Sequence, residues 1–91
     1  MSDKTQEAIT RGRFASELEN NPVYIEAYTI FEAQCFELWK RTTDGRERAR
    51  LWQAIAIAGK LRDIIGMIAA NGRVAEKELE AMIARQEREA T

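Results

Sequence analysis

Residues 44–70 read DGRERARLWQAIAIAGKLRDIIGMIAA, and this stretch decides the fold. Asp44 is a residue type that caps helix N-termini, and Asn71-Gly72 is typical of a helix stop. Between them, apolar side chains recur at steps of three and four, the spacing of one helix face: Leu51, Ile55, Ala58, Leu61, Ile65 and Ile68. The stretch predicts one helix over residues 44–70, about 39 Å long at about 1.5 Å per residue.

A helix of this length has more apolar surface than a chain of 91 residues needs for a small core. Either the rest of the chain or another copy of it must cover this surface. We expect a homo-oligomer whose interface is formed by seven residues of this helix: Leu51, Trp52, Ile55, Ala58, Leu61, Ile65 and Ile68. Gly59 and Gly66 would let another backbone approach closely, or they accommodate Tyr or Trp side chains of the preceding helix.

Three further helices are predicted around the long one. The first covers about residues 4–19, and Gly12 weakens it because glycine inside a helix costs about 1 kcal/mol relative to alanine. Asn21-Pro22 starts the second, over residues 22–41, and the fourth covers about residues 73–88. The expected fold is all-α: a small helical bundle, one domain over residues 1–91, built on a long antiparallel αα-hairpin with shorter N- and C-terminal helices.

The second helix is rich in aromatic residues. One stripe at steps of three and four contains Tyr24, Tyr28, Phe31, Cys35 and Trp39. We interpret this stripe as core, and Cys35 as a buried thiol that packs like a small apolar side chain.

The composition argues against catalysis. The chain has no histidine, which is the commonest base near neutral pH and the commonest metal ligand. Its single cysteine has no base to activate it, and its scattered glycines form no phosphate-binding loop. We therefore expect no enzyme activity, no catalytic residue, no cofactor and no metal site.

The N-terminal sequence lacks the apolar core of a secretory signal, and no apolar run is long enough to span a bilayer. We expect a cytoplasmic protein with no membrane association. A single cysteine, which cannot form an internal disulfide, fits a reducing compartment.

Charge is unevenly distributed, although the net charge is only −1. The segment from Phe14 to Trp39 contains five acidic residues and no basic one. The hairpin tip is basic, and its candidate contacts to phosphate or to an acidic partner are Lys40, Arg41, Arg46, Arg48 and Arg50. We favour pairing of Arg46, Arg48 and Arg50 with Glu47 and with the acidic helix of a neighbouring subunit, because the chain is not basic overall.

Several short motifs follow one another from Arg11 to Leu79. They are Arg11-Gly12-Arg13, the segment LENNP (18–22), the aromatic helix with Trp39 and Thr42, Arg46-Glu47-Arg48 before Leu51-Trp52, and NGRVA (71–75). In this order the chain resembles short helical proteins encoded among bacteriophage structural and DNA-packaging genes. These motifs are helix caps and core positions, so no binding residue follows from the resemblance.

The resemblance implies a role in virion assembly or genome packaging in an infected bacterium, as a small-terminase-like ring component. Phage structural or packaging proteins are then the expected partners, with a location in the bacterial cytoplasm or in association with the virion. Two alternatives remain open: a nucleic-acid-binding or regulatory module that uses the basic tip, and a small phage-encoded inhibitor that occludes a host protein with its acidic helix.

Overall fold

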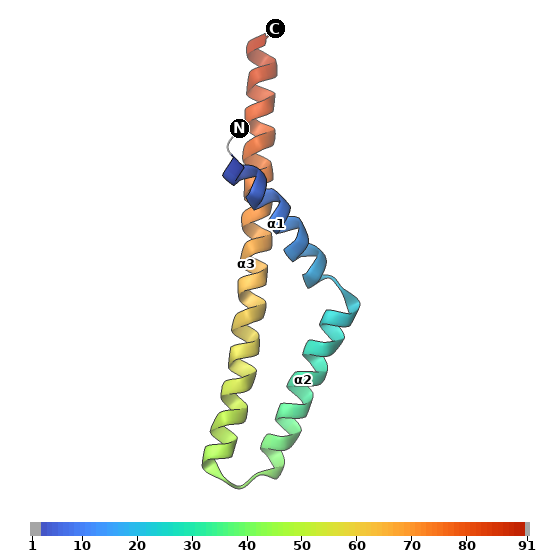
Figure 1. Cartoon of the computed structure of the whole chain (residues 1–91), viewed down its shortest axis with the longest axis vertical. Helices are drawn as coiled ribbons and strands as arrows, with labels where there is room; N and C mark the ends of the chain where they lie inside the picture. The colour runs from blue at the N-terminus through green and yellow to red at the C-terminus, as the bar shows by residue number, and fades with distance from the viewer. Residues whose placement is uncertain (1–2, 91) are drawn as a thin grey trace. The chain divides into compact units, whose positions relative to one another are not determined.

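The computed structural model describes residues 3–90, and within them every regular element is an α-helix (Figure 1). The helices are α1 (Asp3–Glu19), α2 (Pro22–Arg41) and α3 (Gly45–Ala90). The predicted all-α fold class is confirmed, and the predicted bounds of the first two helices agree with α1 and α2 within one residue.

Local capping starts α2 and α3 where the sequence predicts. The Asn21 side chain accepts hydrogen bonds from the backbone N–H groups of Val23 and Tyr24, at 2.9 and 3.2 Å, and Pro22 follows in the first turn. The Asp44 carboxylate accepts the N–H of Arg46 at 2.9 Å in the same way. These side chains satisfy N–H groups that the first turn of a helix leaves without a backbone partner.

The predicted break at Asn71-Gly72 is wrong. No separate helix covers residues 73–88, because α3 continues without interruption from Gly45 to Ala90. Gly72 does not adopt the left-handed conformation of a helix-ending glycine, since no glycine of the described chain has a positive φ. Gly72 instead provides space for another helix, so its role is in packing.

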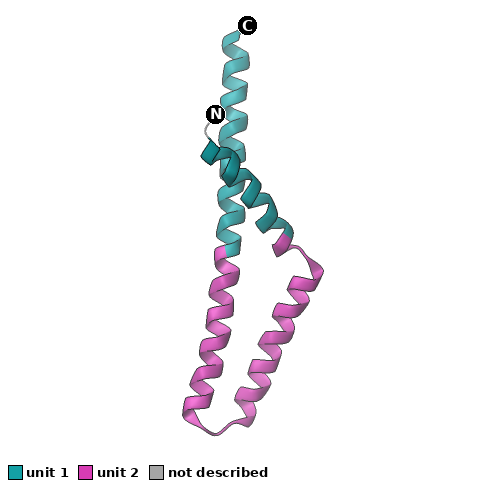
Figure 2. Ribbon diagram, in the orientation of Figure 1, with its two compact units in different colours: residues 1–17, 65–91 teal, residues 18–64 magenta. Residues whose placement is uncertain are grey.

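The described chain divides into two compact units, coloured in Figure 2. Unit 1 comprises Met1–Glu17 and Ile65–Thr91, and unit 2 comprises Leu18–Ile64. α3 contributes its C-terminal half to the first and its N-terminal half to the second.

Unit 1 is a crossing of α1 over the C-terminal half of α3. A Cβ atom placed on Gly12 would lie 2.5 Å from the Gly72 Cα, so the two backbones meet without side chains between them. Four apolar side chains of unit 1 are buried, and three of them are alanines: Ile9, Ala15, Ala69 and Ala75. The Arg13 guanidinium pairs with the Glu76 carboxylate at 2.6 Å beside the crossing. The glycine that weakens α1 as an isolated helix therefore makes its packing possible.

Unit 2 is a hairpin of α2 and the N-terminal half of α3. The Arg48 guanidinium lies 3.8 Å from the centre of the Trp39 ring, and that of Arg62 lies 4.8 Å from the centre of the Tyr28 ring. From the first contact to the second, the residue number rises along α3 and falls along α2, so the two helices are antiparallel. Of the predicted core stripe of α2, Cys35 is buried and Tyr24, Tyr28 and Trp39 are half-buried. The prediction is wrong for Phe31, which is 40% exposed at the edge of the covered side.

Candidate functional site

The most unusual property of this chain is how little of its apolar surface it buries. Among residues 3–90, the buried apolar residues are Ile9, Ala15, Cys35, Ala69 and Ala75, and no large side chain is fully enclosed. By contrast, large apolar side chains are exposed on all three helices. Exposed apolar patches on a soluble protein mark sites of association, so the candidate site is a surface.

The seven predicted interface residues of α3 fall into two groups. Trp52 and Leu61 are exposed. The other five, Leu51, Ile55, Ala58, Ile65 and Ile68, are half-buried. Contacts within the same chain therefore cover part of the surface that we predicted to form the oligomer interface.

Gly59 shows how the hairpin uses a small residue. A Cβ atom placed there would lie 3.5 Å from the Tyr28 hydroxyl, an ordinary van der Waals distance. Of the two interpretations given above for Gly59, this contact favours accommodation of an aromatic side chain of the same chain.

Unit 2 has two rows of exposed apolar side chains, one on each helix. The row on α2 consists of Val23, Ile30 and Leu38, which are 71, 46 and 53% exposed. The row on α3 consists of Ile57, Leu61 and Ile64, which are 70, 59 and 42% exposed. We call these six side chains the apolar face. The sequence analysis identified only Leu61 among them, because it follows the strongest period on each helix and the other five residues lie beside that period.

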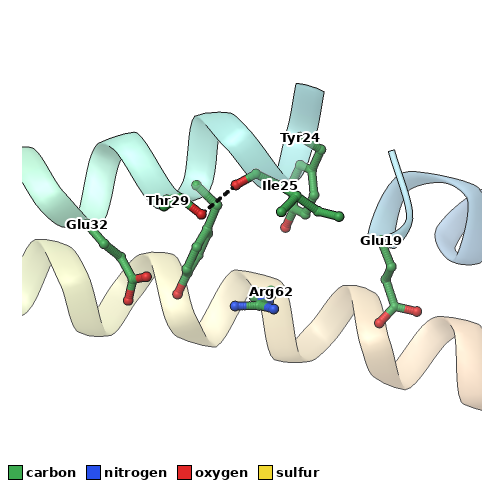
Figure 3. A pocket seen from close by; sticks show the side chains of 7 residues that line it. Glu19, Tyr24, Ile25, Thr29, Glu32 and Arg62 are labelled. Atoms are coloured by element: carbon green, nitrogen blue, oxygen red, sulfur yellow. Dashed lines mark hydrogen bonds between the residues drawn. The ribbon is translucent and has the colours of Figure 1, made fainter. Parts of the chain in front are cut away.

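A pocket of about 100 Å³ lies elsewhere on unit 2 (Figure 3). Figure 3 shows Arg62 of α3 between Glu32 and Glu19. The Arg62 guanidinium lies 4.8 Å from the centre of the Tyr28 ring, which also lines the pocket. Tyr24, Ile25 and Thr29 complete the lining, and the Thr29 hydroxyl donates to the Ile25 carbonyl at 2.9 Å. The lining side chains include no nucleophile paired with a base, so the pocket offers polar contacts and no evident catalytic pair.

Among residues 3–90, two of the five basic side chains at the hairpin tip pair with a carboxylate or stack on a ring, and three do neither. Arg48 stacks on Trp39, while Lys40 contacts the Glu37 carboxylate at 3.4 Å and lies over the Phe36 ring. The Nε of Arg48 is buried without a hydrogen-bond acceptor in the described chain. The remaining three, Arg41, Arg46 and Arg50, are exposed, and their guanidinium groups pair with no carboxylate among residues 3–90. Of five predicted phosphate contacts, three therefore remain available to a partner.

Comparison with protein-family models, with curated proteins and with solved structures found no match to this chain. Over residues 3–90, no helix combines the length and apolar character required to cross a membrane.

Proposed function

We propose that this chain is a non-enzymatic helical interaction protein that acts as an assembly of identical copies. The observation that carries the proposal is the exposure of its large apolar side chains. Among the described residues such side chains are exposed on all three helices, and Val23, Trp52 and Ile57 are 71, 61 and 70% exposed. Exposed apolar side chains of this kind are what an interface between protein chains covers.

The small core supports the same proposal. Burial of large apolar side chains is the main favourable term in folding, and each contributes about 1.5–3 kcal/mol when fully buried. Only Ile9 among the large aliphatic side chains of the described residues is buried within the chain. Association with other copies would bury more of these side chains and stabilise the helices.

A non-catalytic role is supported by the side chains themselves. The chain has no histidine, and its one thiol, Cys35, is buried. A catalytic thiol needs a base that removes its proton and must be accessible to substrate. Cys35 has no histidine to serve as the base, and its side chain is buried.

For the biological setting, we propose bacteriophage virion assembly or DNA packaging, with the chain as a small-terminase-like component in the host cytoplasm or on the virion. The resemblance of residues 11–79 to short helical phage proteins is the reason for this choice. Phage structural or packaging proteins are the corresponding partners.

Light scattering after size-exclusion chromatography tests the proposal, at two salt concentrations and at high micromolar protein. We expect an oligomer at both salt concentrations, because apolar contacts are screened little by ions. A monomer under these conditions would contradict the proposal.

Nucleic-acid binding at the hairpin tip is the second candidate function. It is favoured by the three free arginines, Arg41, Arg46 and Arg50, which lie at one end of unit 2. Fluorescence anisotropy with labelled duplex DNA tests it, and binding should weaken steeply with salt because phosphate contacts release counterions. Replacing the three arginines with glutamate should abolish binding. Salt-insensitive binding, or binding that survives these substitutions, would argue against this candidate.

A further inference from the structure

The pocket of unit 2 has two aromatic rings and two carboxylates around one hollow. Tyr24 and Tyr28 supply the rings, and Glu19 and Glu32 supply the carboxylates. All of its lining residues belong to unit 2, so the pocket is complete within the hairpin and the end of α1 that packs with it. Aromatic rings and carboxylates are both groups that attract an organic cation.

The carboxylates of the pocket are not neutralised by the chain. Two carboxylates, Glu19 and Glu32, against one guanidinium, Arg62, leave the lining with a formal charge of −1. Figure 3 shows Arg62 between the two glutamates, yet within residues 3–90 neither glutamate forms an ion pair. A monovalent cation would make the lining neutral, whereas an anion would meet two like charges.

Arg62 also shows which kind of cation suits the walls. Its guanidinium lies 4.8 Å from the centre of the Tyr28 ring, within the ~6 Å of a cation–π contact. No cation of the described chain lies over the Tyr24 ring, so this second ring is available. A guanidinium is flat, stacks on aromatic rings and forms two parallel hydrogen bonds to one carboxylate, whereas an ammonium is a compact, strongly hydrated charge. A guanidinium therefore uses both kinds of wall.

The size of the pocket fits a group of this kind. One water molecule needs roughly 10–15 Å³ of such space, so a pocket of about 100 Å³ holds a group of several heavy atoms. A guanidinium and the first carbon of its stem fall in this range, and a nucleotide does not. The lining includes exposed side chains, among them Ile25 at 47%, so a ligand can enter from solvent.

We infer that this pocket binds one guanidinium group, with Glu19 and Glu32 as its counter-ions and the Tyr24 ring as a stacking surface. The inference goes beyond the proposed function and does not depend on self-association, because every lining residue belongs to one copy. The guanidinium can come from two sources, an arginine side chain of another protein chain or a small guanidinium compound, and the chemistry of recognition is the same for both.

An NMR titration of the isotope-labelled full chain tests the inference. The probe is N-acetylarginine amide, whose only charge is its guanidinium, and the control is the corresponding amide of citrulline, which has a similar shape and no charge. We expect saturable shifts of the backbone amides of residues 24–32 and of Arg62 with the arginine probe alone, at roughly millimolar affinity. Equal shifts with citrulline, or no saturable shift with arginine, would overturn the inference.

Two matched substitutions test the role of the carboxylates. Glu32 lines the pocket, and Glu26 is an exposed glutamate of the same helix that does not line it. E32Q should weaken binding of the arginine probe by about tenfold, and E26Q should change it by less than about twofold, because only Glu32 contacts the ligand. Equal effects would mean that the overall charge of the chain attracts the probe, and the site would be rejected.

R62Q separates a cation site from an anion site. In a cation site the guanidinium of Arg62 competes with the ligand, so a folded R62Q variant should bind the arginine probe more tightly than the unsubstituted chain does. In an anion site Arg62 would be the main contact, and inorganic phosphate would shift the same amides. Weaker binding of the arginine probe to folded R62Q, or saturable shifts with phosphate, would contradict the inference.

A peptide probe identifies the source of the guanidinium. A blocked peptide with one arginine between alanines is compared with N-acetylarginine amide. Tighter binding of the peptide would assign the guanidinium to a protein side chain, and equal binding would assign it to a small compound, since nothing beyond the guanidinium is then recognised. Light scattering measures self-association separately, so a failure of this inference and a failure of the proposed function are distinguishable.

Discussion

Replacing Gly72 with alanine should loosen unit 1, although alanine is the better helix former. The new Cβ would lie 2.5 Å from the Gly12 Cα and 3.0 Å from the Ala8 carbonyl oxygen. Carbon atoms pack at about 3.5–4.0 Å, so α1 and α3 would have to separate by about 1 Å or more. Both obstacles are backbone atoms, and no side-chain rotation relieves the contact.

The size of the effect follows from two opposing contributions. Gly→Ala inside a helix stabilises by about 1 kcal/mol, whereas overpacking costs about 1–3 kcal/mol. Separation of the helices also uncovers Ile9 and Ala69, the two most buried apolar side chains of the described residues. We expect a net loss of about 1–2 kcal/mol, which corresponds to a melting temperature lower by roughly 5–10 °C.

Gly59 provides the matched control on the same helix. A Cβ there meets only the Tyr28 hydroxyl, at 3.5 Å, so the helix-propensity gain of up to about 1 kcal/mol should be realised. Thermal unfolding followed by circular dichroism, at one fixed protein concentration, should show G72A below and G59A above the unsubstituted chain. Amide hydrogen exchange should locate the loss in α1.

A rise in melting temperature for both variants would refute the close approach of Gly12 and Gly72. The reciprocal variant G12A places its Cβ 2.5 Å from the Gly72 Cα, and it should behave like G72A. A difference in sign between these two would also contradict the argument.

Three further predictions concern single contacts. N21A should lower the free energy of unfolding by about 1 kcal/mol in a urea titration, because two N–H groups of α2 lose their acceptor, and an unchanged midpoint would count against the cap. A double-mutant cycle on Arg13 and Glu76 should give a coupling energy below about 1 kcal/mol, because the Arg13 side chain is 68% exposed and water weakens the ion pair. A coupling energy above ~2 kcal/mol would contradict this exposure. Cys35 is buried, so a thiol reagent should modify it slowly in the folded chain and rapidly in denaturant; rapid modification of the folded chain would place the thiol outside the hairpin.

Much of the local structure could be predicted from the sequence because its causes are local. Asn21 and Asp44 cap helices within two or three residues of themselves, so α2 and α3 start where these residues predict. The covered side of α2 follows from the spacing of Tyr24, Cys35 and Trp39, since helical geometry alone brings them to one side.

Tertiary structure decided the role of Gly72 and the identity of the exposed apolar residues. Asn71-Gly72 has the local signature of a helix stop, but Gly12 of a distant segment packs against it, and a glycine at a backbone contact looks in sequence like a glycine at a helix end. Leu51 and Ile57 are equally apolar as residues, yet Leu51 is half-buried and Ile57 is exposed. The sequence by itself determined how many apolar side chains the long helix has and how they are spaced. Which of them remain for a partner depended on where α1 and α2 pack, because burial is a property of two surfaces in contact.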